Sequence, residues 1–287
     1  MPLRKLSSAL LTLYALIIAY STLSIFFGVQ YQPFLTPLST LLAFTFAIDH
    51  SSQRLGWRRG LLLLGLTFLV SLIFESVGVA TGWVYGSYYY TDKLGYKFLG
   101  LVPLLIPVAW FMMSYPSFII ASRVMPALRN VWAWRTGVAA VGAVIMTSWD
   151  LAMDPMMVAG QHWVWKEAGA YFGVPLQNYW GWWLTIFVTL LLFLLVGRIT
   201  PASLETDDRR FERQAIFSYA IAGLSTVIVN LQIGLGGPAL VGLFAMLPWL
   251  LWGYFGIPQT PLTPSLRSGQ APAPLPKGEG EKMRNWG

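Results

Sequence analysis

Three carboxyl groups lie inside long apolar segments of this sequence, and they are the residues best suited to chemistry. Glu75 lies in the apolar run 61–82, and Asp150 and Asp154 lie in the run 141–155. A carboxyl group in a membrane span is costly to keep ionised and usually marks a functional site. Burial among apolar groups disfavours the anion, so such a group can hold a proton near neutral pH. Each of the three is therefore a candidate catalytic acid or base.

The composition is that of an integral membrane protein. Hydrophobic residues make up 56% of the chain and charged residues only 11%, against about 25% charged residues in soluble domains. Apolar segments of roughly 20 residues can cross a bilayer as helices. The sequence predicts an all-α helix bundle in one transmembrane domain, residues 1–257, followed by a disordered tail rich in Pro and Gly, residues 258–287. The eight predicted spans are 6–28, 33–49, 60–80, 98–120, 135–153, 181–199, 214–232 and 238–255.

The distribution of basic residues predicts the orientation of the spans. With both termini in the cytoplasm, all but three of the 19 Lys and Arg residues fall on the cytoplasmic side, and the exceptions are Lys93, Lys97 and Lys166. This asymmetry follows the positive-inside rule and accounts for the net charge of +7 without a nucleic-acid partner. The connection 205–213 mixes both signs and is predicted to be a solvated loop that leads into a helix.

Polar residues of several spans are predicted to meet in one layer near the outer face. Glu75 falls in the outer half of the third span, while Asp150 and Asp154 are four residues apart and share one face of the fifth. Asn230 lies near the outer end of the seventh span, and His162 lies in the loop after the fifth. Each has an alternative structural explanation, such as helix packing, helix capping or an interfacial hydrogen bond.

The two longest outer connections, 81–97 and 155–181, are dense in Trp and Tyr. The aromatic belt at a membrane interface explains part of this enrichment. It explains less well the clustering of eight residues beside the acidic spans: Trp83, Tyr85, Tyr88, Tyr89, Tyr90, His162, Trp163 and Trp165. The Asp154-Pro155 pair is predicted to end the fifth helix, because a residue before proline disfavours the helical region.

Several chemistries are excluded by the residues present. The chain has no cysteine, no phosphate-binding GxxxxGK[ST] loop and no HExxH motif, and its two histidines, His50 and His162, are predicted on opposite faces. What remains is acid chemistry in an aromatic pocket, with no metal and no cofactor. A protonated carboxyl donates a proton to an electron-rich carbon–carbon double bond, and aromatic faces stabilise the resulting cation. A second carboxylate directs water, and the product is a tertiary alcohol.

Four stretches of the sequence resemble the membrane-bound carotenoid hydratases: FESVGVATGWVYGSYYYTDKLG (74–95), PLLIPVAWFMMSYPSF (103–118), SWDLAMDPMMV (148–158) and the aromatic run 163–183. The resemblance covers roughly residues 10–255. It implies the addition of water to the terminal C1–C2 double bond of an acyclic (psi) carotenoid end group, as in gamma-carotene, lycopene or a related carotenoid.

The resemblance points to the three carboxyl residues, and the layer of polar and aromatic residues beside them predicts the rest of the site. The expected catalytic residues are Glu75, Asp150 and Asp154. The expected substrate-binding residues are Trp83, Tyr85, Trp149, His162, Trp163, Asn178 and Asn230. The expected partners are a carotenoid in the bilayer, membrane lipids and other enzymes of carotenoid biosynthesis, and the expected location is a bacterial or archaeal cytoplasmic membrane.

Three other functions would use the same residues. A membrane lycopene cyclase begins with the same protonation, but an internal double bond traps the cation in place of water. A proton-coupled transporter of a lipid-like solute would use the acids as a relay, and a pigment-binding protein would use only the aromatics. The sequence leaves open which carboxyl donates the proton and which directs water.

Overall fold

The computed structural model describes residues 2–29, 32 and 34–256, so the predicted tail lies outside the described residues. Eight α-helices form this part of the chain, which confirms an all-α polytopic membrane protein. The helices are α1 (Pro2–Phe26), α2 (Leu35–Leu55), α3 (Trp57–Thr81), α4 (Leu105–Val124), α5 (Val131–Ala159), α6 (Leu176–Val196), α7 (Arg209–Gln232) and α8 (Gly236–Phe255). Two short 3-10 helices, η1 (Asp92–Leu94) and η2 (Pro201–Leu204), lie in connections.

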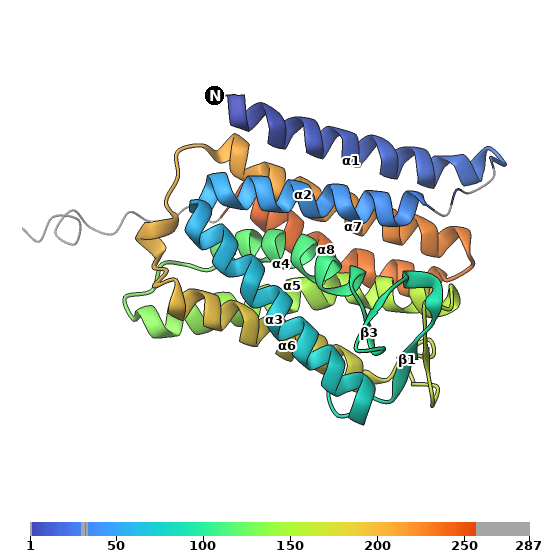
Figure 1. Cartoon of the computed structure of the whole chain (residues 1–287). Helices are drawn as coiled ribbons and strands as arrows, with labels where there is room; N and C mark the ends of the chain where they lie inside the picture. Colours follow the sequence, from blue (N-terminus) through green and yellow to red (C-terminus); the bar gives the residue numbers. More distant parts are fainter. Residues whose placement is uncertain (1, 30–31, 33, 257–287) are drawn as a thin grey trace, which may run out of the picture. The chain divides into compact units, whose positions relative to one another are not determined.

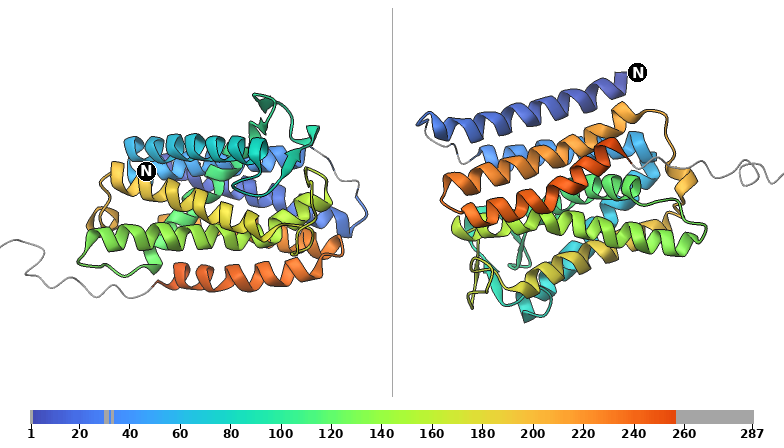
Figure 2. Two further views of the ribbon diagram at one scale, coloured as in Figure 1. Left: turned by 90° about the horizontal axis from the view of Figure 1, so that it is seen from below. Right: turned by 180° about the vertical axis from the view of Figure 1, so that it is seen from behind.

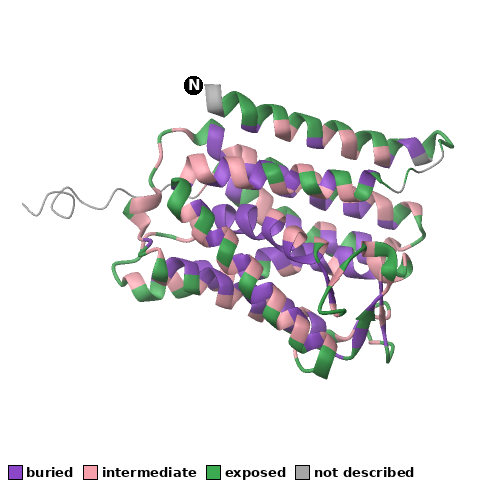
Figure 3. Cartoon of the chain, viewed as in Figure 1, coloured by how far each residue is buried: buried purple, intermediate pink, exposed green. Residues whose placement is uncertain are grey.

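The interior of the bundle is formed chiefly by α4 and α5. Helix α5 packs against α4, α6, α7 and α8, and α4 also contacts α2 and α3 (Figures 1 and 2). Most residues of α4 are buried, whereas most of α1 is exposed (Figure 3). Local signals set the helix limits: the Asn130 side chain accepts hydrogen bonds from Trp132 N and Ala133 N at the start of α5. Gly82 ends α3 with a left-handed φ of 75° that glycine adopts without strain.

Seven of the eight helices are long and apolar enough to cross a membrane, and α2 is the exception. Its last turns carry Asp49, His50 and Arg54, which lower its hydropathy. These groups are paired inside the protein: Ser7 donates to Asp49 at 2.5 Å, and Phe211 O lies 2.8 Å from His50 Nε2. The helix can therefore lie in the bundle despite its polar end, because its polar side chains are satisfied by the protein.

Two predicted helix limits are wrong at the outer end of the bundle. The fourth helix begins at Leu105 and not near 98, since the residues before it form short strands. The fifth helix continues through Pro155 to Ala159. Proline cannot donate to the carbonyl four residues earlier, and here the Tyr171 hydroxyl donates to Leu151 O at 2.9 Å in its place. This substitute bond lets the helix continue about one turn beyond Asp154.

The connection at 205–213 also differs from its prediction. Helix α7 begins at Arg209, with the Asp208 side chain accepting a hydrogen bond from Phe211 N at 2.9 Å. Glu212 is not solvated: it is 4% exposed and forms ion pairs with Arg54 and Arg123. An exposed loop was predicted because the sequence shows the mixed charges but not the buried arginines that face them.

Short strands form in the two aromatic connections, at one end of the bundle (Figure 1). Strand β1 (Tyr88–Tyr90) pairs antiparallel with β4 (Trp163–Trp165), so that Tyr88 faces Trp165 and Tyr90 faces Trp163. Strands β2 (Lys97–Phe98) and β3 (Val102–Pro103) form a second antiparallel pair. The β1–β4 pair links the α3–α4 connection to the α5–α6 connection.

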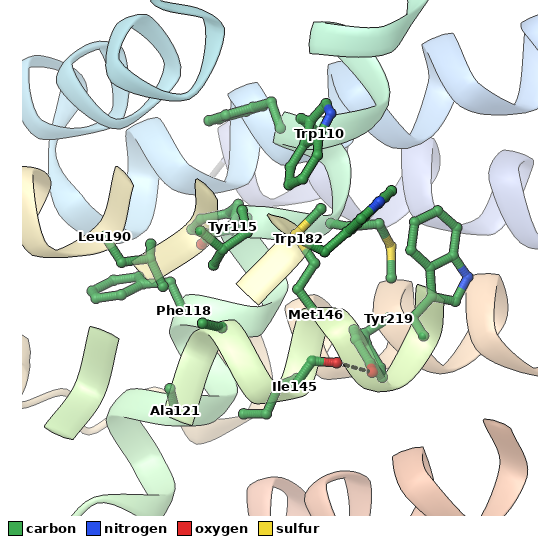
Figure 4. Close-up of a cluster of buried hydrophobic side chains, with 14 of the residues drawn as sticks. Trp110, Tyr115, Phe118, Ala121, Ile145, Met146, Trp182, Leu190 and Tyr219 are labelled. Atoms are coloured by element: carbon green, nitrogen blue, oxygen red, sulfur yellow. Dashed lines mark hydrogen bonds between the residues drawn. The ribbon is translucent and has the colours of Figure 1, made fainter. Parts of the chain in front are cut away.

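A cluster of large buried side chains packs between the helices (Figure 4). Trp110 of α4 stacks on Trp182 of α6 with ring centroids 4.2 Å apart. The Tyr219 hydroxyl, from α7, donates to Ile145 O of α5 at 2.6 Å. The close packing fixes α4, α5 and α6 relative to one another, and these helices carry most of the polar groups described next.

Candidate active site

Glu75 of α3 lies in a cage of hydrogen-bond donors. It is 3% exposed. One carboxyl oxygen accepts from the hydroxyls of Tyr88 and Tyr90, the latter at 2.9 Å, and the other accepts from Trp110 Nε1 at 3.0 Å. An ionised carboxylate only accepts hydrogen bonds, so three donors suit a carboxylate at this position.

Strand alternation brings the two tyrosines to Glu75. Successive side chains of a strand point to opposite faces, and accordingly Tyr88 and Tyr90 are buried while Tyr89 is 49% exposed. Burial raises the pKa of Tyr88 and Tyr90 well above the ordinary value, and the Glu75 charge raises it further. Both hydroxyls therefore keep their protons and remain donors.

Asp150 and Asp154 form a second acidic group on α5. Both are buried, and the amide nitrogen of Asn178, from α6, donates to both carboxyls, to Asp150 at 3.1 Å. The other oxygen of Asp154 accepts from Trp163 Nε1 at 2.7 Å. The other oxygen of Asp150 has no hydrogen-bond partner among the described residues. Two buried carboxyls that share one amide repel each other when both are ionised, so the pair is suited to hold a proton.

A cavity of about 150 Å³ joins the two acidic groups. Glu75 and Asp154 are in its wall, whereas Asp150 is not among the lining residues. The rest of the wall is mostly aromatic or apolar, and it comprises Thr36, Thr40, Tyr85, Tyr88, Tyr90, Leu94, Leu105, Ile106, Ala109, Trp110, Met112, Trp149, Met153, Met156, Met157, Trp163, Trp165, Asn178 and Trp182. Within the described part of the chain, no group of three or more His, Cys, Asp or Glu residues could hold a metal ion. The mostly apolar wall can hold an apolar molecule against the carboxyl groups of Glu75 and Asp154.

Four of the predicted substrate-binding residues line the cavity: Tyr85, Trp149, Trp163 and Asn178. Hydrogen bonds to threonines of other helices hold two of these side chains in place. The Tyr85 hydroxyl lies 2.8 Å from Thr185 Oγ1, and Trp149 Nε1 donates to Thr226 Oγ1 at 3.1 Å. Asn178 contacts the two aspartates, so it is placed to position these acids.

Trp83, His162 and Asn230 are not among the residues that line the cavity. Trp83 is 81% exposed, and His162 is half-buried with Nδ1 3.3 Å from Met157 O. Asn230 donates to Ala152 O at 2.8 Å and so joins α7 to α5. Substrate binding by these three residues stays a prediction.

The sequence analysis placed Tyr88 and Tyr90 in the aromatic cluster but gave them no role at the site. It did not predict Trp110 or Trp182 as site residues. The alternating aromatics Tyr88-Tyr89-Tyr90 and Trp163-Val164-Trp165 are a period-two signal for half-buried strands, and this signal could have identified the tyrosines. Trp110 and Trp182 lie in apolar helices, where nothing in the sequence separates a site residue from a core residue.

Comparison with known proteins identifies relatives of this chain. A family model described as "Carotenoid biosynthesis protein" matches residues 31–248. The bisanhydrobacterioruberin hydratase of Haloarcula japonica is 39% identical over 138 residues, which are 47% of this chain and 45% of that protein. The match thus spans less than half the length of that relative. No solved structure shows significant similarity.

Proposed function

Because the chain belongs to the carotenoid biosynthesis protein family, we propose that it is a carotenoid hydratase. It adds water to the terminal C1–C2 double bond of an acyclic carotenoid end group, with gamma-carotene, lycopene or a related carotenoid as substrate. The name of the Haloarcula japonica relative supports the reaction class. The observation that carries the proposal is the cavity itself, in which Glu75 and Asp154 lie in a wall that is otherwise mostly aromatic or apolar.

Asp154 is the proposed proton donor. It lines the cavity, and it shares the Asn178 amide with Asp150, so one proton is expected to reside on the pair. The proton passes from Asp154 to C2 of the substrate, and the π electrons of the double bond form the new C–H bond. The positive charge is left on C1, which is a tertiary carbocation. Asp150 acts behind Asp154 as the second member of the pair.

Glu75 is the proposed base. Its three donors stabilise a carboxylate that faces the same cavity. A water molecule attacks C1 through its oxygen, and Glu75 accepts the proton that the water loses. The product is a tertiary alcohol, and transfer of the proton from Glu75 back to the aspartate pair through water completes the cycle. The sum is addition of one water molecule without net oxidation or reduction, so the reaction needs no electron donor or acceptor.

Aromatic rings are proposed to stabilise the cation between these two steps. Trp110, Trp149 and Trp182 lie together in the cavity wall, with Trp149 and Trp182 ring centroids 6.2 Å apart. Cations near the face of an indole ring are stabilised by about 0.5–2 kcal/mol. The carboxylate of Glu75 adds attraction for the positive carbon in a site with little water.

The test is product analysis in cells that make lycopene and gamma-carotene, with and without this gene. We expect a carotenoid heavier by one water, with a tertiary hydroxyl at a psi end. Asp154→Asn and Glu75→Gln should each abolish it, while the exposed Asp92→Asn variant should match the wild type. A product of unchanged mass with a new ring would make the protein a cyclase. No new pigment from either substrate, with the protein present in the membrane, would refute hydration of both.

A further inference from the structure

The cavity is far too small for the whole of the proposed substrate, and this inference rests on the proposed function. A long carotenoid is comparable in length to the hydrocarbon core of a bilayer, about 30 Å. The cavity holds about 150 Å³, which suits only the end group. The remaining polyene must leave the cavity through an opening in its wall.

The exposure of the lining residues shows where the wall opens. The residues around the carboxyl groups are buried: Glu75, Trp110 and Asp154 are at most 3% exposed. In contrast, Thr36 on α2 is exposed, and a further set of lining residues is partly exposed. That set includes Thr40 on α2, Leu105 and Met112 on α4, and Met156 and Met157 on α5. The cavity thus reaches the protein surface between α2, α4 and α5.

Most of the partly exposed lining residues lie on α2, α4 and α5, and Leu94 of η1 is the one that comes from an outer connection. Above the carboxyl groups, the β1–β4 pair contributes Tyr88, Tyr90, Trp163 and Trp165 to the wall, and each is less than 9% exposed. These four aromatics close the cavity towards the predicted outer water phase. An opening between membrane helices faces lipid, which is where an apolar substrate is dissolved.

The chemistry of the opening also fits a polyene. Among the described residues, none of the six that form the opening carries a charged side chain. Thr40 donates its hydroxyl hydrogen to Thr36 O in its own helix at 3.0 Å, so it does not need a polar partner in the opening. The three methionines are flexible and polarisable, and they pack well against irregular or rigid apolar ligands.

We propose that this opening, formed by Thr36, Thr40, Leu105, Met112, Met156 and Met157, is a lateral entrance that binds the polyene segment next to the reacting end. The substrate enters sideways from the bilayer, end group first. The entrance selects long, rod-shaped apolar molecules with an unringed end, since a rod must lie between α2, α4 and α5 while its end reaches Asp154.

Thr40 and Thr45 provide a matched pair for the test. Both are threonines of α2 that donate to the carbonyl four residues earlier, but Thr45 is not among the lining residues. Thr40→Trp should lower hydration at least about tenfold, because blocking the approach misplaces the reacting end, whereas Thr45→Trp should retain wild-type activity. Equal thermal midpoints in detergent would show that both variants fold.

A binding measurement separates the entrance from the reaction. The chain has no cysteine, so Thr40→Cys and Thr45→Cys each offer one site for a bimane fluorophore in lipid nanodiscs. Added lycopene should quench the label at 40 more strongly than the label at 45, at the same lycopene-to-lipid ratio. Equal quenching of the two labels would refute the proposed entrance. Wild-type hydration by a folded Thr40→Trp variant would also refute it. Selective quenching at 40 without hydration by the wild type would support the entrance and refute the proposed function.

Discussion

Replacing Glu212 by glutamine should destabilise the protein strongly. Glu212 accepts hydrogen bonds from Arg54 Nε at 3.1 Å and Nη2 at 2.7 Å, and it forms a second ion pair with Arg123. Between 5% and 11% of each of the three side chains is exposed. The arginines also donate to Leu204 O and Gly253 O, both at 2.5 Å. The cluster therefore joins α2, α4, α7, η2 and α8.

The size of the destabilisation follows from the two arginine charges that Glu212→Gln leaves unpaired. Glutamine keeps the size of the side chain but removes the negative charge, so two buried guanidinium groups lose their counter-charge. Breaking a buried ion pair in this way costs about 3–5 kcal/mol. At about 2–4 °C per kcal/mol for a chain of this size, the midpoint of thermal unfolding should fall by roughly 10 °C.

The assay is thermal unfolding of the purified protein in detergent, followed by circular dichroism. Asp92→Asn is the control, because it breaks the ion pair between Lys97 and an Asp92 side chain that is 99% exposed, and it should leave the midpoint unchanged. If Glu212→Gln unfolds within about 2 °C of the wild type, the buried cluster does not hold the helices together as reasoned.

Three further changes test other parts of the structure. Tyr171→Phe should lower stability by about 0.5–1.5 kcal/mol in urea-induced unfolding, because it removes the hydroxyl that donates to Leu151 O; an unchanged unfolding midpoint would contradict this. Burial lowers the pKa of His162, so its stabilising contribution is present above about pH 6.5 and is lost as the pH falls below that value. His162→Gln should therefore flatten the dependence of the thermal midpoint on pH below 6.5, and a parallel shift of the two curves would argue otherwise. Gly181→Ala places a methyl group 2.6 Å from a backbone oxygen and should cost about 1–3 kcal/mol, whereas Gly65→Ala meets nothing within 4 Å and should be neutral or stabilising; equal effects in chemical unfolding would refute the packing.

The sequence was informative about features that depend on local composition. Apolar runs predicted all eight helices, because a helix that crosses a membrane needs about 20 mostly apolar residues in succession. The depth of Glu75 and Asp154 within their runs predicted that the two residues lie at the same level, and both line one cavity. A polar residue in an apolar run is visible without any knowledge of its neighbours in space.

Features that depend on distant partners were not predictable from the chain. The pairing of Tyr88 with Trp165 has no register signal in either segment. The continuation of α5 through Pro155 depends on Tyr171, which lies in the following connection. The buried position of Glu212 depends on Arg54 and Arg123. In each case a residue far along the chain satisfies a group that would otherwise favour a different structure.

The pairing of β1 with β4 also constrains the order in which the protein can be built. Tyr88 and Tyr90 donate to Glu75, and Trp165 holds Tyr88 from a strand that is synthesised much later. At about 5–20 residues per second, several seconds separate the synthesis of the two strands. During that interval α3 must enter the membrane while its carboxyl group lacks the completed cage. The donor cage of Glu75 can thus be completed only after β4 has been synthesised, and synthesis halted before Trp163 would leave Glu75 without the strand that holds Tyr88.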